Sequence, residues 1–226
     1  VHIIHQYSID KSTLSKFVEK VSSFNKSKLK TVEYISKSRT QYLPYSSIIL
    51  NEIMTITNPK KIICSISGLR EGSLSIDHFK NIKESEIFTK SIEYIALKRG
   101  DLGSTYQKYF KFILPVFDGN EHYNKKLLYL ACVLSHMDWG LGAFQKAELV
   151  FQETLNTPLL RLTHKERIQL ALSCYWRYCS IKYNPKFEYL TFLNNNEIFS
   201  SKQVGAALRF SQSLTSISTI FLEEFK

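Results

Sequence analysis

The sequence predicts a mainly helical protein with a small α/β part at its N-terminal end. Only eight glycines and five prolines punctuate 226 residues, which favours long helices over many short strands. Strand-like and helix-like segments alternate up to about residue 85, whereas the apolar spacing from residue 86 onward is helical throughout. A hydrophobic content of 44% is enough for one large or two modest domains. We therefore expect two parts, residues 1–85 and residues 86–226.

The N-terminal part begins with a predicted strand and two predicted helices. Residues 1–9 (VHIIHQYSI) are rich in β-branched and aromatic residues, which favour a strand. Asp10 is a suitable N-cap for a helix whose apolar face carries Leu14, Phe17, Val18 and Val21. Pro44 fits the first turn of the second helix, and the Asn58-Pro59 pair is expected to end it.

Residues 60–79 (KKIICSISGLREGSLSIDHF) form the most informative stretch. The apolar run 62–66 predicts a short strand covered on both faces by helices, as in a parallel sheet. Two glycines, Gly68 and Gly72, then precede the apolar residues of a predicted helix. Open α/β sheets place ligands where a strand ends in such a loop, and the start of the next helix attracts anions.

A phosphate-binding role for this loop is one of two interpretations. Gly68 and Gly72 would let the backbone approach a ligand, and Arg70 presents a fork of donors suited to phosphate. In the other interpretation the glycines only form a turn, and Arg70 pairs with its neighbour Glu71.

The residues of this loop resemble a known family. Ser67-Gly68-Leu69-Arg70-Glu71-Gly72 is similar to the S-x-x-G-L-R-E-G stretch of the exopolyphosphatase / guanosine pentaphosphate phosphohydrolase family. Residues 36–44 (SKSRTQYLP) are similar to the family's R-A-D-x-I-x-P segment, with Arg39 at its arginine, Gln41 at its aspartate and Tyr45-Ser46 replacing its glycine. The resemblance implies that residues 1–85 are the end of the second lobe of an actin-like (ribonuclease H-like) fold. It also implies phosphate binding by Arg70, Gly68, Gly72, Glu71 and Arg39.

The second part, residues 86–226, is predicted to be an all-helical bundle. Its central helix should be the nearly all-apolar segment Leu127–Met137. Arg99-Gly100 are expected to end the first of the two helices before it, and Pro115 and later Asp118-Gly119 to stop the second. Thr163 is a suitable N-cap for a later helix. The remaining predicted helices, by apolar spacing, are Phe88–Ile95, Tyr106–Leu114, Phe144–Leu155, Glu166–Tyr183 and Val204–Leu214, with a polar connection over Asn184–Asn196.

This second part resembles the family's HD-like helical domain. Ser135-His136 stand where relatives carry a His-Asp or Ser-Asp pair, so neither position of a metal-binding His-Asp doublet matches. A scattered site made of His122, His136 and His164 is conceivable, but we favour His136 and His164 as packing or helix-end residues. We therefore assign no metal ligand and no catalytic residue to this chain. The family resemblance implies Mg²⁺ for the complete enzyme.

The charge and the cysteine content of the sequence indicate which binding partners and which cellular compartment to expect. The net charge is +10, and residues 1–85 carry 13 basic and 7 acidic groups, which favours polyanionic partners. A solvated surface in a lysine-rich sequence is the competing explanation. The four cysteines form no C-x-x-C pair and predict buried thiols in a reducing compartment, which we take to be the cytoplasm. The sequence has no run of 18 apolar residues, so we expect no membrane association.

Three functions are consistent with these features. The leading one is the C-terminal portion of an exopolyphosphatase-type hydrolase acting on polyphosphate or guanosine pentaphosphate. This portion would supply a polyanion-binding groove and not the catalytic base, so the chain alone should be inactive. The alternatives are a non-catalytic polyanion- or RNA-binding module, although nucleic acid is not the partner we favour, and an independent HD metal phosphohydrolase. The resemblance also allows a homodimer through the helical part.

Overall fold

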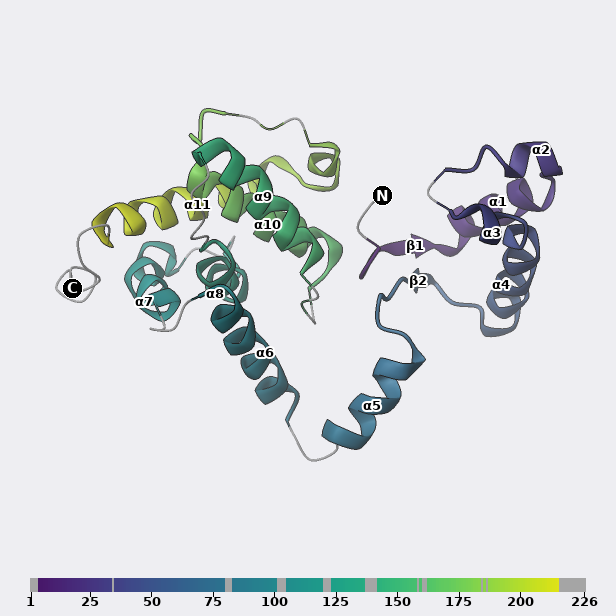
Figure 1. Cartoon of the computed structure of the whole chain (residues 1–226), viewed down its shortest axis with the longest axis horizontal. Coiled ribbons are helices and arrows are strands. Elements are labelled where there is room, and N and C mark those ends of the chain that lie inside the picture. Colours follow the sequence, from purple (N-terminus) through teal and green to yellow (C-terminus); the bar gives the residue numbers. More distant parts are fainter. Residues whose placement is uncertain are drawn as a thin grey trace. The chain divides into compact units, whose positions relative to one another are not determined.

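A computed structural model describes residues 4–33, 35–79, 83–100, 105–119, 123–136, 142–157, 159, 162–183, 185 and 187–215 (Figure 1). The chain divides into two compact units, residues 1–66 and residues 67–226. The first unit holds two short strands with helices, and the second is helical in all its described elements. The predicted mainly helical fold with an α/β N-terminal part is confirmed. The division falls before the helix that follows Gly68, whereas the boundary predicted from the sequence lies after residue 85.

The sheet of the first unit differs from the expected one. Strand β1 (Ser8–Asp10) pairs antiparallel with β2 (Lys61–Ile63), with Ile9 opposite Ile62. The expected parallel strand with both faces covered is therefore wrong. The helices between the strands return the chain to the end of β1, so Lys61 begins opposite Asp10 and β2 runs back along β1. Ile63 points away from the helices and is 59% exposed.

The helices of the first unit cover one face of this sheet. Helix α1 (Lys11–Ser22) packs on α4 (Leu43–Thr57), while α2 (Lys26–Leu29) and α3 (Lys37–Thr40) are single turns between them. The core consists of Leu14, Val18 and Met54, with Ile9, Leu50 and Ile62 packed against them. The predicted start of α1 and the predicted end of α4 are confirmed: Asp10 is the N-cap residue of α1, and Asn58 ends α4 in a left-handed conformation with φ 44°. The predicted first strand is shorter than expected because Gln6 turns the chain at φ 62°.

The second unit consists of long helices joined by short connections. In chain order they are α5 (Leu69–Phe79), α6 (Glu84–Lys98), α7 (Thr105–Phe117), α8 (Lys125–Leu134), α9 (Ala143–Asn156), α10 (His164–Tyr178), the 3₁₀ turn η1 (Glu188–Phe192) and α11 (Asn195–Thr215). Arg99-Gly100 end α6 as predicted. Pro115 does not end α7, because near the C-terminal end the loss of one backbone donor leaves most of the helix intact. The helix ends at Phe117, directly before the predicted stop at Asp118-Gly119.

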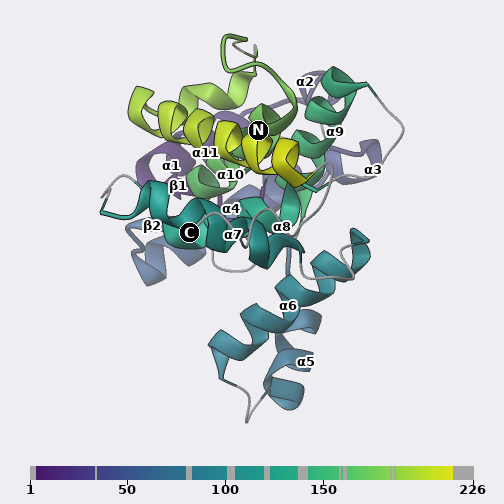
Figure 2. The same ribbon diagram turned by 90° about the vertical axis from the view of Figure 1, so that its left-hand side faces the viewer.

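Helices α8 and α10 form the centre of this unit (Figures 1 and 2). The side chains of α8 from Leu130 to Leu134 are all buried, which confirms its predicted central position. Helix α10 packs against α8, α9 and α11. Thr163 caps α10 as predicted: its hydroxyl accepts a hydrogen bond from the Glu166 backbone, and the Glu166 carboxylate accepts one from the Thr163 backbone.

Candidate phosphate-binding segment

Four of the residues predicted to bind phosphate lie together in the first turn of α5. The backbone N–H of Gly68 donates a hydrogen bond to Oε2 of Glu71 at 2.7 Å. Arg70 is exposed, and no ion pair joins it to Glu71 in the part of the chain that the structure describes. The interpretation that Arg70 merely pairs with its neighbour is therefore wrong. Glu71 caps the helix start, and the Arg70 guanidinium is left facing solvent.

The two glycines leave the surface at the start of α5 open. A Cβ atom added to Gly72 would meet no atom within 4 Å, and one added to Gly68 would meet only Glu71 Oε2, at 3.2 Å. Neither glycine has a positive φ. The Gly72 N–H donates to the Gly68 carbonyl at 3.1 Å and so belongs to the helix. The donors that an anion could use here are therefore the remaining first-turn N–H groups and the Arg70 side chain.

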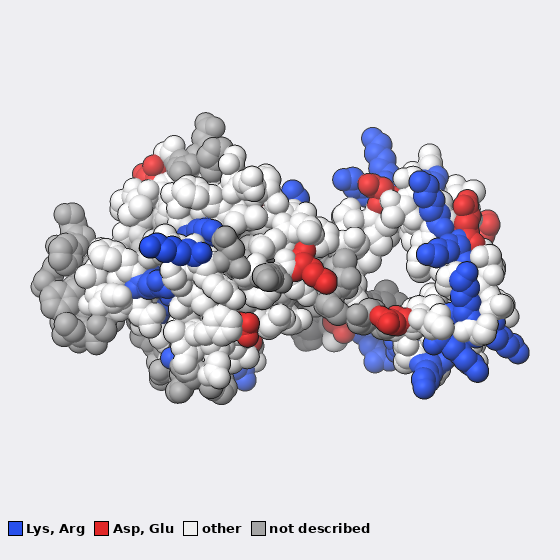
Figure 3. All heavy atoms as spheres, turned by 90° about the horizontal axis from the view of Figure 1, so that it is seen from above, with Lys and Arg blue, Asp and Glu red and all other residues white. Residues whose placement is uncertain are grey.

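Arg39, the fifth predicted contact, lies on α3 in the first unit and is exposed. Lysine and arginine side chains gather over this unit, on the right of Figure 3. Residues 1–66 carry ten Lys and Arg against four Asp and Glu, a net charge of +6. Within the described residues of this unit none of these cations forms an ion pair with a carboxylate, although Lys11 Nζ donates to Asn58 Oδ1 at 2.7 Å. The surface of this unit therefore carries an excess of positive charge.

Two arginines from other helices contact the end of α8, where Ser135-His136 stand in place of the His-Asp doublet. Ser135 is the C-cap residue of α8 and is fully buried. Its hydroxyl accepts a hydrogen bond from Nη1 of Arg177 at 2.7 Å, and its carbonyl accepts one from the Tyr178 hydroxyl at 2.7 Å. Arg99 Nη1 donates to the carbonyl of Leu134, the last residue of α8. Two guanidinium groups thus bind the C-terminal end of α8, where cations favourably oppose the helix dipole.

Arg177 is buried without a carboxylate partner among the described residues. It is 1% exposed, its Nε donates to Gln212 Oε1 at 3.1 Å, and its Nη2 has no hydrogen-bond partner. Its guanidinium also lies over the rings of Tyr109 and Tyr178, at 5.4 and 5.5 Å from their centroids. The sequence indicates Arg99 only as the end of a helix and gives no signal for Arg177, because the partners of both side chains at the end of α8 lie more than 30 residues away.

The histidines do not assemble a metal site in the described residues. His164 begins α10 with its ring 5.0 Å from that of Phe192, and burial together with the nearby Arg167 lowers its pKa. His136 follows Ser135, whereas His122 and the predicted segment Met137–Trp139 lie outside the described residues. No group of three or more His, Cys, Asp or Glu is placed to hold a metal ion in the described ranges. The described residues therefore offer no ligand set for the Mg²⁺ that the family resemblance implies.

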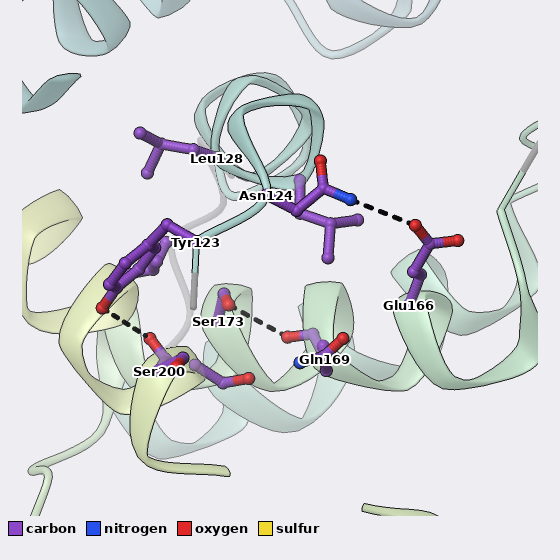
Figure 4. Close-up of a pocket in the computed structure, with 10 residues that line it drawn as sticks. Tyr123, Asn124, Leu128, Glu166, Gln169, Ser173 and Ser200 are labelled. Atoms are coloured by element: carbon purple, nitrogen blue, oxygen red, sulfur yellow. Dashed lines mark hydrogen bonds between the residues drawn. The ribbon is translucent and has the colours of Figure 1, made fainter. Parts of the chain in front are cut away.

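A small pocket lies between α8, α10 and α11 (Figure 4). Its volume is about 100 Å³, and its polar groups already bond to one another: Tyr123 to Ser200, Asn124 to Glu166, and Ser173 to Gln169. No lysine or arginine lines it. The pocket is therefore unsuited to a phosphate chain.

Comparison with known proteins finds a family match over the N-terminal part of the chain. The sequence model of the Ppx/GppA phosphatase family matches residues 1–79, which include β1, β2, Arg39 and the α5 turn with Arg70. The resemblance to the exopolyphosphatase / guanosine pentaphosphate phosphohydrolase family is thus confirmed over these residues, and the match supports a phosphatase-family hydrolase. A search of curated proteins found no significant match. Among the described residues no helix is long and apolar enough to cross a membrane.

Proposed function

We propose that this chain is the C-terminal portion of an exopolyphosphatase-type phosphoanhydride hydrolase and that it binds polyphosphate or guanosine pentaphosphate. The observation that carries the proposal is the exposed, unpaired guanidinium of Arg70 at the start of α5, inside the segment that matches the phosphatase family. The four free cysteines, three of them buried, fit a reducing cytoplasm.

Binding at α5 would use two kinds of donor. The first-turn N–H groups and the positive end of the helix dipole favour an oxyanion, and the Arg70 fork can donate two parallel hydrogen bonds to one phosphate. Gly68 and Gly72 leave room for the ligand, while Glu71 holds the turn through the Gly68 N–H. By themselves, Arg39 and the lysines of the first unit would attract polyanions through counterion release, which weakens with salt.

Catalysis requires groups that we do not assign to this chain. A general base must reach the attacking water, and fixed donors must stabilise the transferring phosphoryl group. In the α5 turn the one carboxylate, Glu71, already accepts the Gly68 N–H. We therefore propose that the chain contributes the polyanion-binding surface, and that the base, the second phosphate loop and the Mg²⁺ implied by the family belong to other parts of the complete enzyme.

The test measures binding and turnover with the purified 226-residue chain. Fluorescence anisotropy should show a labelled polyphosphate chain bound more tightly than an RNA of equal charge, and Arg70→Ala should weaken that binding several-fold. The matched control is Lys83→Ala, which removes an exposed cation from the N-cap position of α6. Phosphate release with Mg²⁺ should be absent.

Three outcomes would reject the proposal. If Arg70→Ala and Lys83→Ala weakened polyphosphate binding equally, Arg70 would contribute only general charge attraction and no specific contact. Tighter binding of the RNA would indicate the nucleic-acid-binding module instead. Sustained phosphate release, abolished by one substitution in this chain, would place the chemistry here.

A further inference from the structure

A β-turn before β1 contacts the segment that follows β2. The Tyr7 N–H donates to the Ile4 carbonyl at 3.1 Å, and Gln6, at the third position of this turn, has a φ of 62°. A positive φ at the third position alone defines a type II turn, in which glycine is preferred there. Glutamine in this conformation is strained, and such strain persists only where the surrounding contacts hold the backbone.

Two backbone hydrogen bonds join this turn to Cys64, the first residue after β2. The Gln6 N–H donates to the Cys64 carbonyl at 2.8 Å, and the Cys64 N–H donates to the Tyr7 carbonyl at 2.9 Å. These bonds extend the β1–β2 pairing beyond Ser8 and Ile63. The main chain is therefore fixed as far as Cys64 by backbone contacts.

His5 extends this anchoring by two residues. The residue is buried, with 6% of its surface exposed, and its Nδ1 accepts a hydrogen bond from the Ile66 N–H at 3.4 Å. Within the described residues this is the one hydrogen bond that Ile66 makes, and the Ile66 side chain is 54% exposed. Ile66 is the last residue of the first unit, and Ser67 alone separates it from Gly68. The His5 imidazole thus fixes the backbone directly before the α5 turn.

We infer that His5 is a positioning residue for phosphate binding at the α5 turn. It acts through Ile66, whose backbone leads into Gly68 and Arg70, and it does not contact the ligand itself. Donors that are already ordered bind an anion more tightly, because no affinity is lost in ordering a loose segment. The inference rests on the proposed function of this turn.

Two substitutions in the full chain separate the acceptor from the bulk of the ring. His5→Leu removes Nδ1 and keeps an apolar side chain in the buried site, whereas His5→Asn keeps an acceptor, the amide oxygen. Anisotropy with labelled polyphosphate should show about five-fold weaker binding for His5→Leu, the effect of one lost hydrogen bond, and wild-type binding for His5→Asn. The matched control is Ser47→Ala, which removes a buried hydroxyl of the same unit that donates to the Leu43 carbonyl. This control should bind like the wild type.

Hydrogen exchange provides a measurement that needs no ligand. The Ile66 amide and the amides of the α5 turn should exchange faster in His5→Leu than in the wild type and His5→Asn, while the amides of α4 stay equally protected in all three. Unchanged exchange in a folded His5→Leu protein overturns the inference whatever the affinities are. If His5→Leu does not fold, His5→Asn decides, because it must match the wild type in both measurements.

The two measurements also separate this inference from the proposed function. A wild-type chain that binds no polyphosphate, with the exchange rates as expected, would reject the proposed function and leave His5 as a structural anchor without a part in binding. A chain that binds polyphosphate with equal affinity in the wild type and a folded His5→Leu would overturn the role of His5 and leave the α5 site intact.

Discussion

Arg177 and Ser135 are both buried, and the guanidinium Nη1 of Arg177 lies 2.7 Å from the hydroxyl oxygen of Ser135. This contact joins α10 to the C-terminal end of α8 across 42 residues of sequence. Arg209 Nε donates to the Arg177 carbonyl at 3.2 Å, and Arg99 pairs with Glu153 at 3.3 Å while it caps Leu134. The network links the ends of α6, α8, α10 and α11 through positive side chains.

Replacing the Arg177 side chain should destabilise the helical unit strongly. Arg177→Met removes the donors to Ser135 and Gln212 and leaves buried polar atoms unpaired, which costs about 3 kcal/mol in the free energy of unfolding. Arg177→Lys should not restore this stability, since one ammonium cannot reproduce two directed bonds and a planar contact with two tyrosines. Urea unfolding monitored by circular dichroism measures the free energy of unfolding of both variants. An Arg177→Met protein as stable as the wild type would show that the network is dispensable.

The pH dependence of stability should contain a contribution from His164. Burial and Arg167 lower its pKa, so the folded protein holds the neutral imidazole while the unfolded chain binds a proton. The unfolded state therefore binds more protons below its own pKa of about 6.5, and stability falls as the pH drops through that region. His164→Phe keeps a ring against Phe192 but cannot be protonated.

Melting temperatures of the wild type and His164→Phe, measured between pH 7.5 and 5.5, isolate this contribution. The wild type should lose more stability than the variant over this range, and the two curves should be parallel above pH 7. Identical slopes throughout would mean that His164 titrates normally in the folded protein.

Two glycines on helices should respond in opposite ways to alanine. A Cβ on Gly205 of α11 would lie 2.5 Å from Trp176 Cβ and 2.9 Å from the Ser173 carbonyl, so Gly205→Ala must push α11 away from α10 and should cost about 2 kcal/mol. A Cβ on Gly72 of α5 meets nothing, so Gly72→Ala should stabilise the helix by up to ~1 kcal/mol. Thermal unfolding of the two variants beside the wild type is the measurement. Equal effects would mean that α10 and α11 do not approach closely at Gly205.

Local signals in the sequence predicted local structure well. The Thr163–Glu166 capping box and the end of α4 at Asn58 were predictable because each depends on residues within four positions of one another. The antiparallel direction of the β1–β2 pair depends on how α1 and α4, which connect the two strands in sequence, pack on each other. The composition of the strands does not contain that information. The contacts of Arg99 with Leu134 and of Arg177 with Ser135 could not be predicted either, because each joins two helices that are distant in sequence. At the candidate site, the sequence suggested the Arg70 turn but left the partner of Glu71 open, and in the structure that partner is the Gly68 N–H.

Glu71 should weaken anion binding at the α5 turn while it stabilises the turn. Its carboxylate accepts the Gly68 N–H at 2.7 Å and places a negative charge beside the helix start, where a phosphate would bind. Glu71→Gln keeps an oxygen to accept this hydrogen bond but removes the charge. We therefore expect polyphosphate to bind a few-fold more tightly to Glu71→Gln than to the wild type at 0.15 M salt, with a change in stability of less than about 1 kcal/mol.

The salt dependence separates the roles of Glu71 and Arg70. Removal of one cation that contacts phosphate lowers the slope of log affinity against log salt by about one, so Arg70→Ala should show a shallower slope than the wild type. Glu71→Gln should keep the wild-type slope or steepen it, and the double variant should bind no more tightly than Arg70→Ala if the gain requires the Arg70 contact. Anisotropy titrations at four salt concentrations measure all three slopes. If Glu71→Gln strengthened binding equally with and without Arg70, the anion would lie elsewhere on the basic surface, and the first turn of α5 would not be the phosphate site.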